Sequence, residues 1–179
     1  MEEEALEFAR RAHKDQKRKY SQEPYIEHPK RVAEMVRTVK HSTEMICAAY
    51  LHDVVEDTPV SLNEIEQRFG TRVAQLVNDL SDKFTKKDFP DLNRRKRKEK
   101  EVERQSMIDP DAKTIKLADV IDNTPDILRN DRNFARKYIP EMDALVNVLK
   151  DGDPELFRRA LKEVQKAKEV LRNKTQKNY

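Results

Sequence analysis

The sequence contains very little glycine and cysteine, and no tryptophan at all. Only two of its 179 residues are glycine, and no segment alternates apolar and polar residues, so a β-sandwich or a Rossmann-type sheet is not expected. The one cysteine, Cys47, has no second cysteine in the chain with which to form a disulfide. A reduced, cytoplasmic setting is therefore the simplest expectation.

Long apolar runs and a dominant charge sign are also missing. No apolar stretch approaches the roughly 18 residues of a membrane span, and the first residues, MEEEALEF, are too acidic for a secretory signal. We therefore expect no membrane association. Charged residues make up 40% of the chain, but 37 basic residues nearly balance 34 acidic ones and helical patterning is widespread, which argues against disorder.

What the sequence does contain is helical periodicity, with apolar residues on one face of most segments. Capping residues and prolines mark the ends of these segments. The pattern predicts an all-α fold, with one domain over residues 1–172 and a polar C-terminal tail over residues 173–179. The expected helices cover roughly residues 3–17, 29–39, 42–57, 61–70, 71–80, 92–107, 109–123, 131–150 and 153–173.

The segment AAYLHDVVEDT, residues 48–58, places one histidine and three carboxylates in the most apolar run of the chain. As one continuous helix, it would gather His52, Asp53, Glu56 and Asp57 in a wedge of about 140° while apolar residues cover the rest. Burying carboxylates without partners is costly, so a positive charge is expected beside them. The alternative is ordinary amphipathicity, with the wedge facing water.

Two further polar residues lie in unusual contexts. Asp119 is surrounded by apolar residues in TIKLADVIDNT, and Asp122 and Asn123 follow it at i+3 and i+4 on the same helix face. A helix cap or a salt bridge is the alternative explanation for Asp119. His28, in YIEHPK, lies at a junction between a loop and a helix, where a purely structural histidine is the alternative.

Taken together, these positions supply two imidazoles and two carboxylates: His28, His52, Asp53 and Asp119. A mixed set of nitrogen and oxygen ligands suits Mn²⁺, Fe²⁺ or Zn²⁺ with positions left open for water. The sequence therefore predicts a divalent metal site built from segments that are far apart along the chain.

The order H…HD…D on an all-helical chain resembles the HD-domain metal-dependent phosphohydrolases. Longer segments narrow the resemblance to the hydrolase domain of RelA/SpoT-type proteins and the small stand-alone alarmone hydrolases. These segments are RKYSQEPYIEHP, AAYLHDVVEDT, RFGTRVAQLV, NRRKRKEK and TIKLADVIDN, within about residues 4–150. The resemblance implies a single HD-domain helical bundle that removes the 3′-pyrophosphate from ppGpp or pppGpp, giving GDP or GTP and pyrophosphate.

The resemblance also implies a role for individual residues. The implied metal ligands, normally for Mn²⁺, are His28, His52, Asp53 and Asp119. The implied catalytic pair, which activates or positions the attacking water, is Glu56 and Asp57. The implied substrate contacts are Arg18, Lys19, Asn123 and Tyr138. The chain departs from the family's usual pattern at Val120 and at Thr124-Pro125, beside the expected nucleotide pocket but at none of the ligands.

Two other functions remain open from the sequence. One is an HD phosphatase acting on another nucleotide, such as a nucleotide monophosphate or the 2′-phosphate of NADPH. The other is a non-enzymatic protein that binds RNA or another polyanion through the six basic residues between Arg94 and Lys100. No aromatic residue is interleaved with that run and the net charge is only +3, so a small nucleotide is the expected partner rather than a nucleic acid.

Overall fold

A computed structural model describes residues 1–173, and within that range the chain forms ten α-helices and no β-strand. This confirms the predicted all-α fold. None of these helices is long and apolar enough to cross a membrane. Of the expected polar tail, residues 174–179 lie outside the described range. The helices are α1 (Glu2–Ala12), α2 (Glu27–Arg37), α3 (Thr43–Leu51), α4 (Val54–Asp57), α5 (Leu62–Phe69), α6 (Thr71–Leu80), α7 (Arg94–Ser106), α8 (Pro110–Asn130), α9 (Arg132–Val148) and α10 (Pro154–Asn173).

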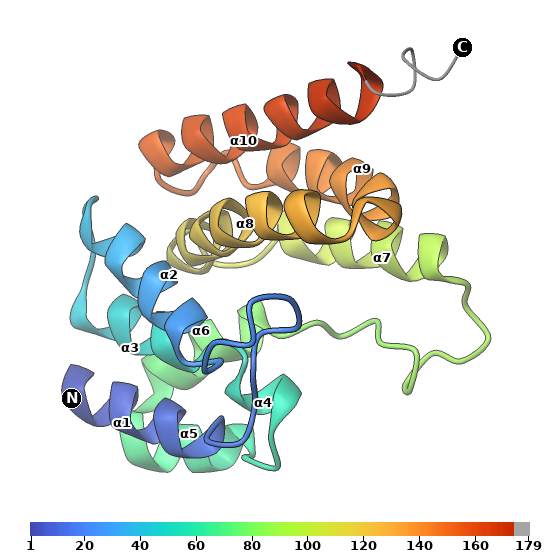
Figure 1. Ribbon diagram of the computed structural model, residues 1–179. Coiled ribbons are helices and arrows are strands. Elements are labelled where there is room, and N and C mark those ends of the chain that lie inside the picture. The colour runs from blue at the N-terminus through green and yellow to red at the C-terminus, as the bar shows by residue number, and fades with distance from the viewer. Residues whose placement is uncertain (174–179) are drawn as a thin grey trace.

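The longest helix, α8, runs through the middle of the molecule (Figure 1). It packs against α2, α3 and α6 on one side and against α9 and α10 on the other. Helix α1 packs on α3, α5 on α6, and α7 on α9. Because α8 contacts α2 and α3, residues near the start of the chain lie beside residues of α8, which are far away in the sequence.

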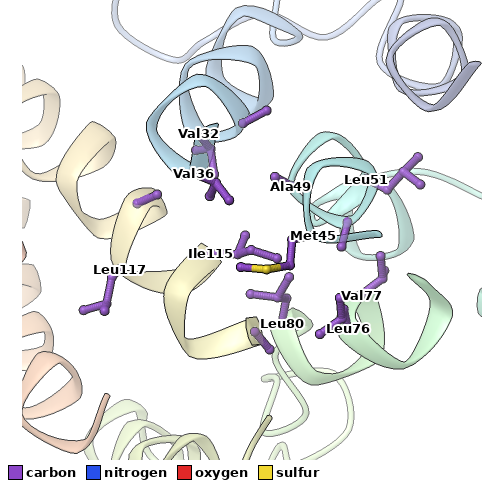
Figure 2. Packing of buried hydrophobic residues seen from close by; sticks show 14 of the residues in the cluster. Val32, Val36, Met45, Ala49, Leu51, Leu76, Val77, Leu80, Ile115 and Leu117 are labelled. Atoms are coloured by element: carbon purple, nitrogen blue, oxygen red, sulfur yellow. The ribbon is translucent and has the colours of Figure 1, made fainter. Parts of the chain in front are cut away.

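The apolar core fills the space between α2, α3, α6 and α8. Figure 2 shows Ile115 of α8 and Met45 of α3 pointing toward each other, with Leu80 of α6 close by. The Ile115 side chain is fully buried, and Asp119 follows it by one helical turn on the same face. The core therefore fixes the helix that carries Asp119.

Most helix starts follow the capping signals in the sequence. Ser42, Ser61 and Asn93 each accept a hydrogen bond from the backbone N–H three residues later, at the starts of α3, α5 and α7. Gly70 separates α5 from α6 with a φ of +87°. Residues with a side chain rarely adopt that conformation, so this glycine permits the sharp turn between the two helices.

One correction concerns the segment expected as a single helix over residues 42–57. Helix α3 ends at Leu51 and α4 begins at Val54, with a turn at residues 52–53 in which Asp53 adopts φ −95° and ψ −8°, at the edge of the helical region. The turn between them consists of the His-Asp pair itself.

A second correction concerns α8, which was expected to end near Asn123. It continues through Pro125 to Asn130. Proline lacks the N–H that would bond the carbonyl of Ile121, so one helical hydrogen bond is missing. Arg18 Nη2 donates both to Asn123 Oδ1 at 2.9 Å and to Asp126 Oδ2 at 3.1 Å, which joins the turns on either side of Pro125.

The first two helices also differ from the expected bounds. Helix α1 ends at Ala12 rather than near residue 17, and α2 begins at Glu27, before Pro29. The residues between them form a small hairpin with one isolated antiparallel bridge, from Lys17 to Pro24. This hairpin lies against the turn that contains His52.

Candidate metal centre and adjacent cleft

Three of the predicted metal ligands meet in the described structure. One side-chain atom from each of His28, His52 and Asp119 lies within 4.8 Å of the other two, and all three residues are buried. His28 lies in the first turn of α2, His52 follows the last residue of α3, and Asp119 lies in the middle of α8. The distance from His28 Nε2 to Asp119 Oδ1 is 3.3 Å.

The fourth predicted ligand, Asp53, lies against the same cluster. Its Oδ2 is 3.1 Å from His52 Nε2 and 3.6 Å from His28 Nε2. The hydroxyl of Tyr25 donates a hydrogen bond to the same Oδ2 at 2.7 Å. The break between α3 and α4 turns this carboxylate toward the two histidines.

The hydrogen bonds of the histidines fix which nitrogen faces the cluster. His52 Nδ1 lies 2.8 Å from the carbonyl oxygen of Ala49, which can only accept, so Nδ1 carries the hydrogen. Its Nε2 is buried and makes no well-aligned hydrogen bond among the described residues, although Asp53 Oδ2 lies 3.1 Å away. An unpartnered imidazole nitrogen beside two carboxylates fits a divalent metal ion, so the residues present suit such an ion.

A second layer of residues supports His28. Its Nδ1 lies 2.7 Å from Asp122 Oδ2, and Arg31 Nε donates to Asp122 Oδ1 at 2.7 Å. Carboxylates behind metal-binding histidines fix ring orientation in this way. The sequence indicated that Asp122 shares a face with Asp119, but it carried no signal for Arg31, which lies 91 residues earlier.

Opposite charges shape the protonation of this cluster. Burial by itself lowers the pKa of His52, but the Asp53 carboxylate outweighs it and raises that pKa to about 9. Burial likewise opposes the charge on Asp53, yet His52 holds the pKa of Asp53 well below its usual range. Without a metal, a proton on the His52 ring therefore balances the Asp53 carboxylate. A bound ion would take over that role and require neutral imidazoles.

Lys116 is a residue that the sequence analysis missed. Its Nζ lies 3.0 Å from Asp119 Oδ2, while the other oxygen of Asp119 faces His28 and accepts from Asn123 Nδ2 at 2.6 Å. Burial lowers the pKa of Lys116, but attraction to Asp119, Asp82 and Glu56 outweighs burial and raises it. The i−3 spacing from Asp119 was the available signal.

A cleft of about 160 Å³ opens beside the cluster, between α4, α7, α8 and α9. Asp53, Glu56, Lys116 and Asp119 line its inner end, and Tyr138 is part of its wall. The side chains of Asp82 and Lys98 lie across from them, with Lys98 Nζ 2.6 Å from Asp82 Oδ2. The cluster of His28, His52 and Asp119 therefore borders a hollow that contains both acids and cations.

Glu56 lies on the accessible wall of this cleft. Its Oε1 accepts a hydrogen bond from the backbone N–H of Asp82 at 2.7 Å. The surrounding protein displaces water and raises the pKa of Glu56 to about 7; Lys116 opposes this shift and the Asp82 carboxylate adds to it. A carboxylate with such a pKa exchanges protons readily near neutral pH.

Asp57 does not share the position of Glu56, which corrects the expected common wedge. Its Oδ2 accepts a hydrogen bond from Gln16 Nε2 at 2.9 Å, on the side of the Lys17–Pro24 hairpin. The two acids therefore point in different directions from α4. Adjacent residues of one helix point about 100° apart, so the expected wedge is wide enough to face two different neighbours, the cleft and the hairpin.

Three of the four predicted substrate contacts lie around a second hollow of about 390 Å³, whereas Tyr138 lies in the wall of the first cleft. Arg18, Lys19 and Asn123 line the second hollow, together with Tyr25 and Phe134. Arg18 is buried and reaches Asn123, whose amide in turn reaches the metal-ligand candidate Asp119. Asn123 lines both hollows, whereas Lys19 lies farther out and pairs with Asp131 at 3.3 Å.

The basic run of α7 is largely engaged in ion pairs. Arg94 pairs with Glu141 at 2.7 Å and Arg95 with Glu99 at 2.8 Å. Of this run, Lys98 lines the cleft. The run therefore contributes one cation to the cleft.

Sequence and structure comparisons agree with this geometry. Residues 5–142 match the HD-domain family. The guanosine-3′,5′-bis(diphosphate) 3′-pyrophosphohydrolase MESH1 of Homo sapiens is 40% identical over 129 residues, which is 70% of this chain and 69% of the human protein. The bifunctional (p)ppGpp synthase/hydrolase SpoT of Escherichia coli is 47% identical over 88 residues, which is 49% of this chain and 12% of SpoT.

A solved structure described as a metazoan orthologue of SpoT that hydrolyses ppGpp has a similar fold. Its TM-score is 0.81 at 29% sequence identity, and the match covers 93% of this chain and 94% of the other. The HD-domain match covers most of the chain and includes every residue of the cluster and the cleft acids. This protein belongs to the HD-domain family and is similar to (p)ppGpp hydrolases.

Proposed function

We propose that this protein is a metal-dependent hydrolase that removes the 3′-pyrophosphate from (p)ppGpp, releasing GDP or GTP and pyrophosphate. The observation that carries the proposal is the cluster of His28, His52 and Asp119 at the inner end of a cleft lined by Glu56 and Lys116. The similarity to the human and Escherichia coli enzymes supports the same reaction. We further propose that the protein acts in the cytoplasm, which suits its single buried, unpaired cysteine.

The proposed metal is Mn²⁺, held by His28, His52, Asp53 and Asp119. When bound, a divalent ion supplies Lewis-acid activation of water and neutralises phosphate charge. The mixed nitrogen and oxygen ligand set suits this ion. Asp122 would hold the His28 ring and the carbonyl of Ala49 would hold the His52 ring, each leaving Nε2 directed at the cluster.

The two residues of the proposed catalytic pair, Glu56 and Asp57, have different positions and therefore different proposed roles. Glu56, with a pKa of about 7, is suited to accept a proton from water on the cleft side. Asp57 is on the other side of α4, held by Gln16, and is suited to orient water or a neighbouring group from there. Because both follow Asp53 within four positions, each lies within one helical turn of a proposed ligand.

The proposed substrate contacts suit a ligand with several phosphates and a purine. Arg18 and Lys19 provide positive charge on the outer hollow, and Asn123 joins that hollow to the cleft. Tyr138 forms part of the cleft wall, where its partly buried ring can pack against a sugar or base. The cleft and the outer hollow adjoin at Asn123, so together they offer room for a ligand as long as a nucleotide with several phosphates.

Incubation of the purified protein with Mn²⁺ and ppGpp, followed by anion-exchange separation of the products, tests this function. We expect equal amounts of GDP and pyrophosphate, and no product after treatment with a chelator. A panel containing NADPH and nucleotide monophosphates serves as the comparison. Release of orthophosphate from one of these, with ppGpp left intact, would replace the proposed reaction by that of an HD phosphatase with another substrate.

A further inference from the structure

The small hairpin between α1 and α2 places two hydrogen-bond donors against the start and end of α4. The backbone N–H of Tyr25 donates to the carbonyl of Gln16 at 3.0 Å, so these two residues are held as neighbours. From this pair, the Tyr25 hydroxyl reaches Asp53 at 2.7 Å, and the Gln16 amide reaches Asp57 at 2.9 Å. One hairpin thus holds a proposed metal ligand and a proposed catalytic acid.

The contact with Asp57 determines how the Gln16 amide is oriented. An ionised carboxylate can only accept hydrogen bonds, so the group that Gln16 presents to Asp57 must be its NH₂. The carbonyl oxygen of the same amide, Oε1, then faces the other way. It lies 2.8 Å from Nδ1 of His13.

The orientation of Gln16 in turn determines the tautomer of His13. An amide oxygen can only accept, so Nδ1 of His13 must carry the hydrogen that it donates. The Nε2 of the neutral ring is then an acceptor, and it is buried without a hydrogen-bond partner among the described residues. The ring is 3% exposed and lies 4.8 Å from the ring of Tyr25, so packing holds it in place. His13 is therefore a rigid anchor for the amide.

We infer that Gln16 is a positioning residue for Asp57, with its amide held in one orientation by His13 in the Nδ1–H tautomer. Asp57 is exposed at the end of a helix of four residues. Within the described chain, Gln16 is the side chain that hydrogen-bonds it. The expected effect on catalysis rests on the proposed function. The expected tautomer of His13 does not depend on it.

Kinetics of a Gln16→Met variant test the catalytic consequence. Met has a similar length but cannot donate, so kcat for ppGpp should fall roughly tenfold, the effect of losing about one charge-assisted hydrogen bond, while KM and manganese content stay unchanged. In an Asp57→Asn background, the same substitution should have no further effect, because its target is already altered.

The matched control is Gln22→Met. Gln22 belongs to the same hairpin, but its amide donates to the carbonyl of Lys19 at 3.0 Å rather than to an acid. We expect its kcat to equal that of the wild type. An equal loss in both variants, a raised KM with kcat unchanged, or effects that multiply in the double variant would each overturn the inference.

Nitrogen NMR of the histidine rings tests the anchor without any enzymatic assay. At about pH 8, where an ordinary histidine is neutral, the ¹⁵N shifts of His13 should report the Nδ1–H tautomer. In Gln16→Met, the ring should move toward the Nε2–H form. A wild-type Nε2–H tautomer would overturn the inference even if ppGpp is hydrolysed. If ppGpp is not hydrolysed, an Nδ1–H result would still support the anchor.

Discussion

The buried cluster and the neighbouring cleft treat carboxylates in opposite ways. In the cluster, His52 and Lys116 hold the pKa of Asp53 and Asp119, respectively, below the usual range. In the cleft, Glu56 has a pKa of about 7 because protein surrounds it and Asp82 repels its charge. These carboxylates differ in pKa because Asp53 and Asp119 have a cationic group in contact and Glu56 does not. Asp53 and Asp119 therefore stay ionised, as the proposed ligands of a cation must, whereas Glu56 can exchange a proton near neutral pH.

The largest expected effect comes from removing a histidine of the cluster. His52→Ala should lose nearly all bound Mn²⁺ and lower activity by about 10³-fold or more, because a proposed ligand is lost and the carboxylates face each other unbalanced. Elemental analysis after reconstitution measures the metal, and circular dichroism checks folding. The matched control is His41→Ala, since His41 is exposed and its Nδ1 hydrogen-bonds the carbonyl of Val39 at 2.8 Å, away from the cluster. Full metal content in a folded His52→Ala protein would contradict the proposed site.

The next effect concerns the cleft acid. Glu56→Gln keeps the shape of the side chain but removes the proton acceptor, so kcat should fall by about 10²-fold with the metal retained. Steady-state kinetics and elemental analysis measure both quantities on the same sample. Glu99→Gln, on the exposed face of α7, is the control. If metal content falls in proportion to activity, Glu56 helps to hold the metal, and the distinction between the cluster and the cleft acid is wrong.

A smaller effect should follow from removing the cation that the two regions share. Lys116 favours the ionised form of Glu56, so Lys116→Met should raise the pKa of Glu56 above its present value of about 7. A base with a higher pKa is ionised only at higher pH, and the acidic limb of the profile of kcat/KM against pH should shift upward. Lys116→Arg keeps the charge and should restore most of the wild-type profile. An unshifted limb in Lys116→Met would mean that the limb does not report Glu56.

The smallest expected effect is on the stability of the metal-free protein. The pKa of Glu56 is about 7 in the folded state, against an ordinary value of 4.5. The folded state therefore binds the proton more tightly, and this stabilisation is lost as pH rises from about 4.5 through 7. Urea unfolding should show Glu56→Gln gaining stability relative to the wild type between pH 5 and pH 8. The gain will be modest because protein surrounds Glu56 on one side only: its other side faces the open cleft, where water screens its charge.

The parts of the molecule that could be predicted are those with local signals. The cap at Ser61 marked the start of α5 correctly, and polar residues in apolar runs marked His52 and Asp119 as members of one site. Lys116 had only its i−3 spacing from Asp119 as a signal, and lysine is so common in this chain that this spacing does not stand out. The contact between Gln16 and Asp57 joins positions 41 residues apart, and no periodicity reports such a contact.

The predicted position of Asp57 failed for a different physical reason. Adjacent residues of a helix point about 100° apart, so Glu56 faces the cleft while Asp57 faces Gln16 of the hairpin. Periodicity gives this angle but not which segments lie on either side of the helix. Pro125 led to the opposite error, because the helix was expected to end before it and instead continues to Asn130. Packing of α8 against α10 and the hydrogen bonds of Arg18 offset the missing backbone bond.

The proline inside α8 also has a consequence for local opening of the structure. The turn around Pro125 has one backbone hydrogen bond fewer than the rest of α8, and Arg18 spans it from outside through Asn123 and Asp126. Amide protons of this turn should therefore exchange with deuterium before those around the fully buried Ile115 and Leu117. The helix that carries Asp119 is thus rigid where it contacts the core and easiest to open just beyond Asn123.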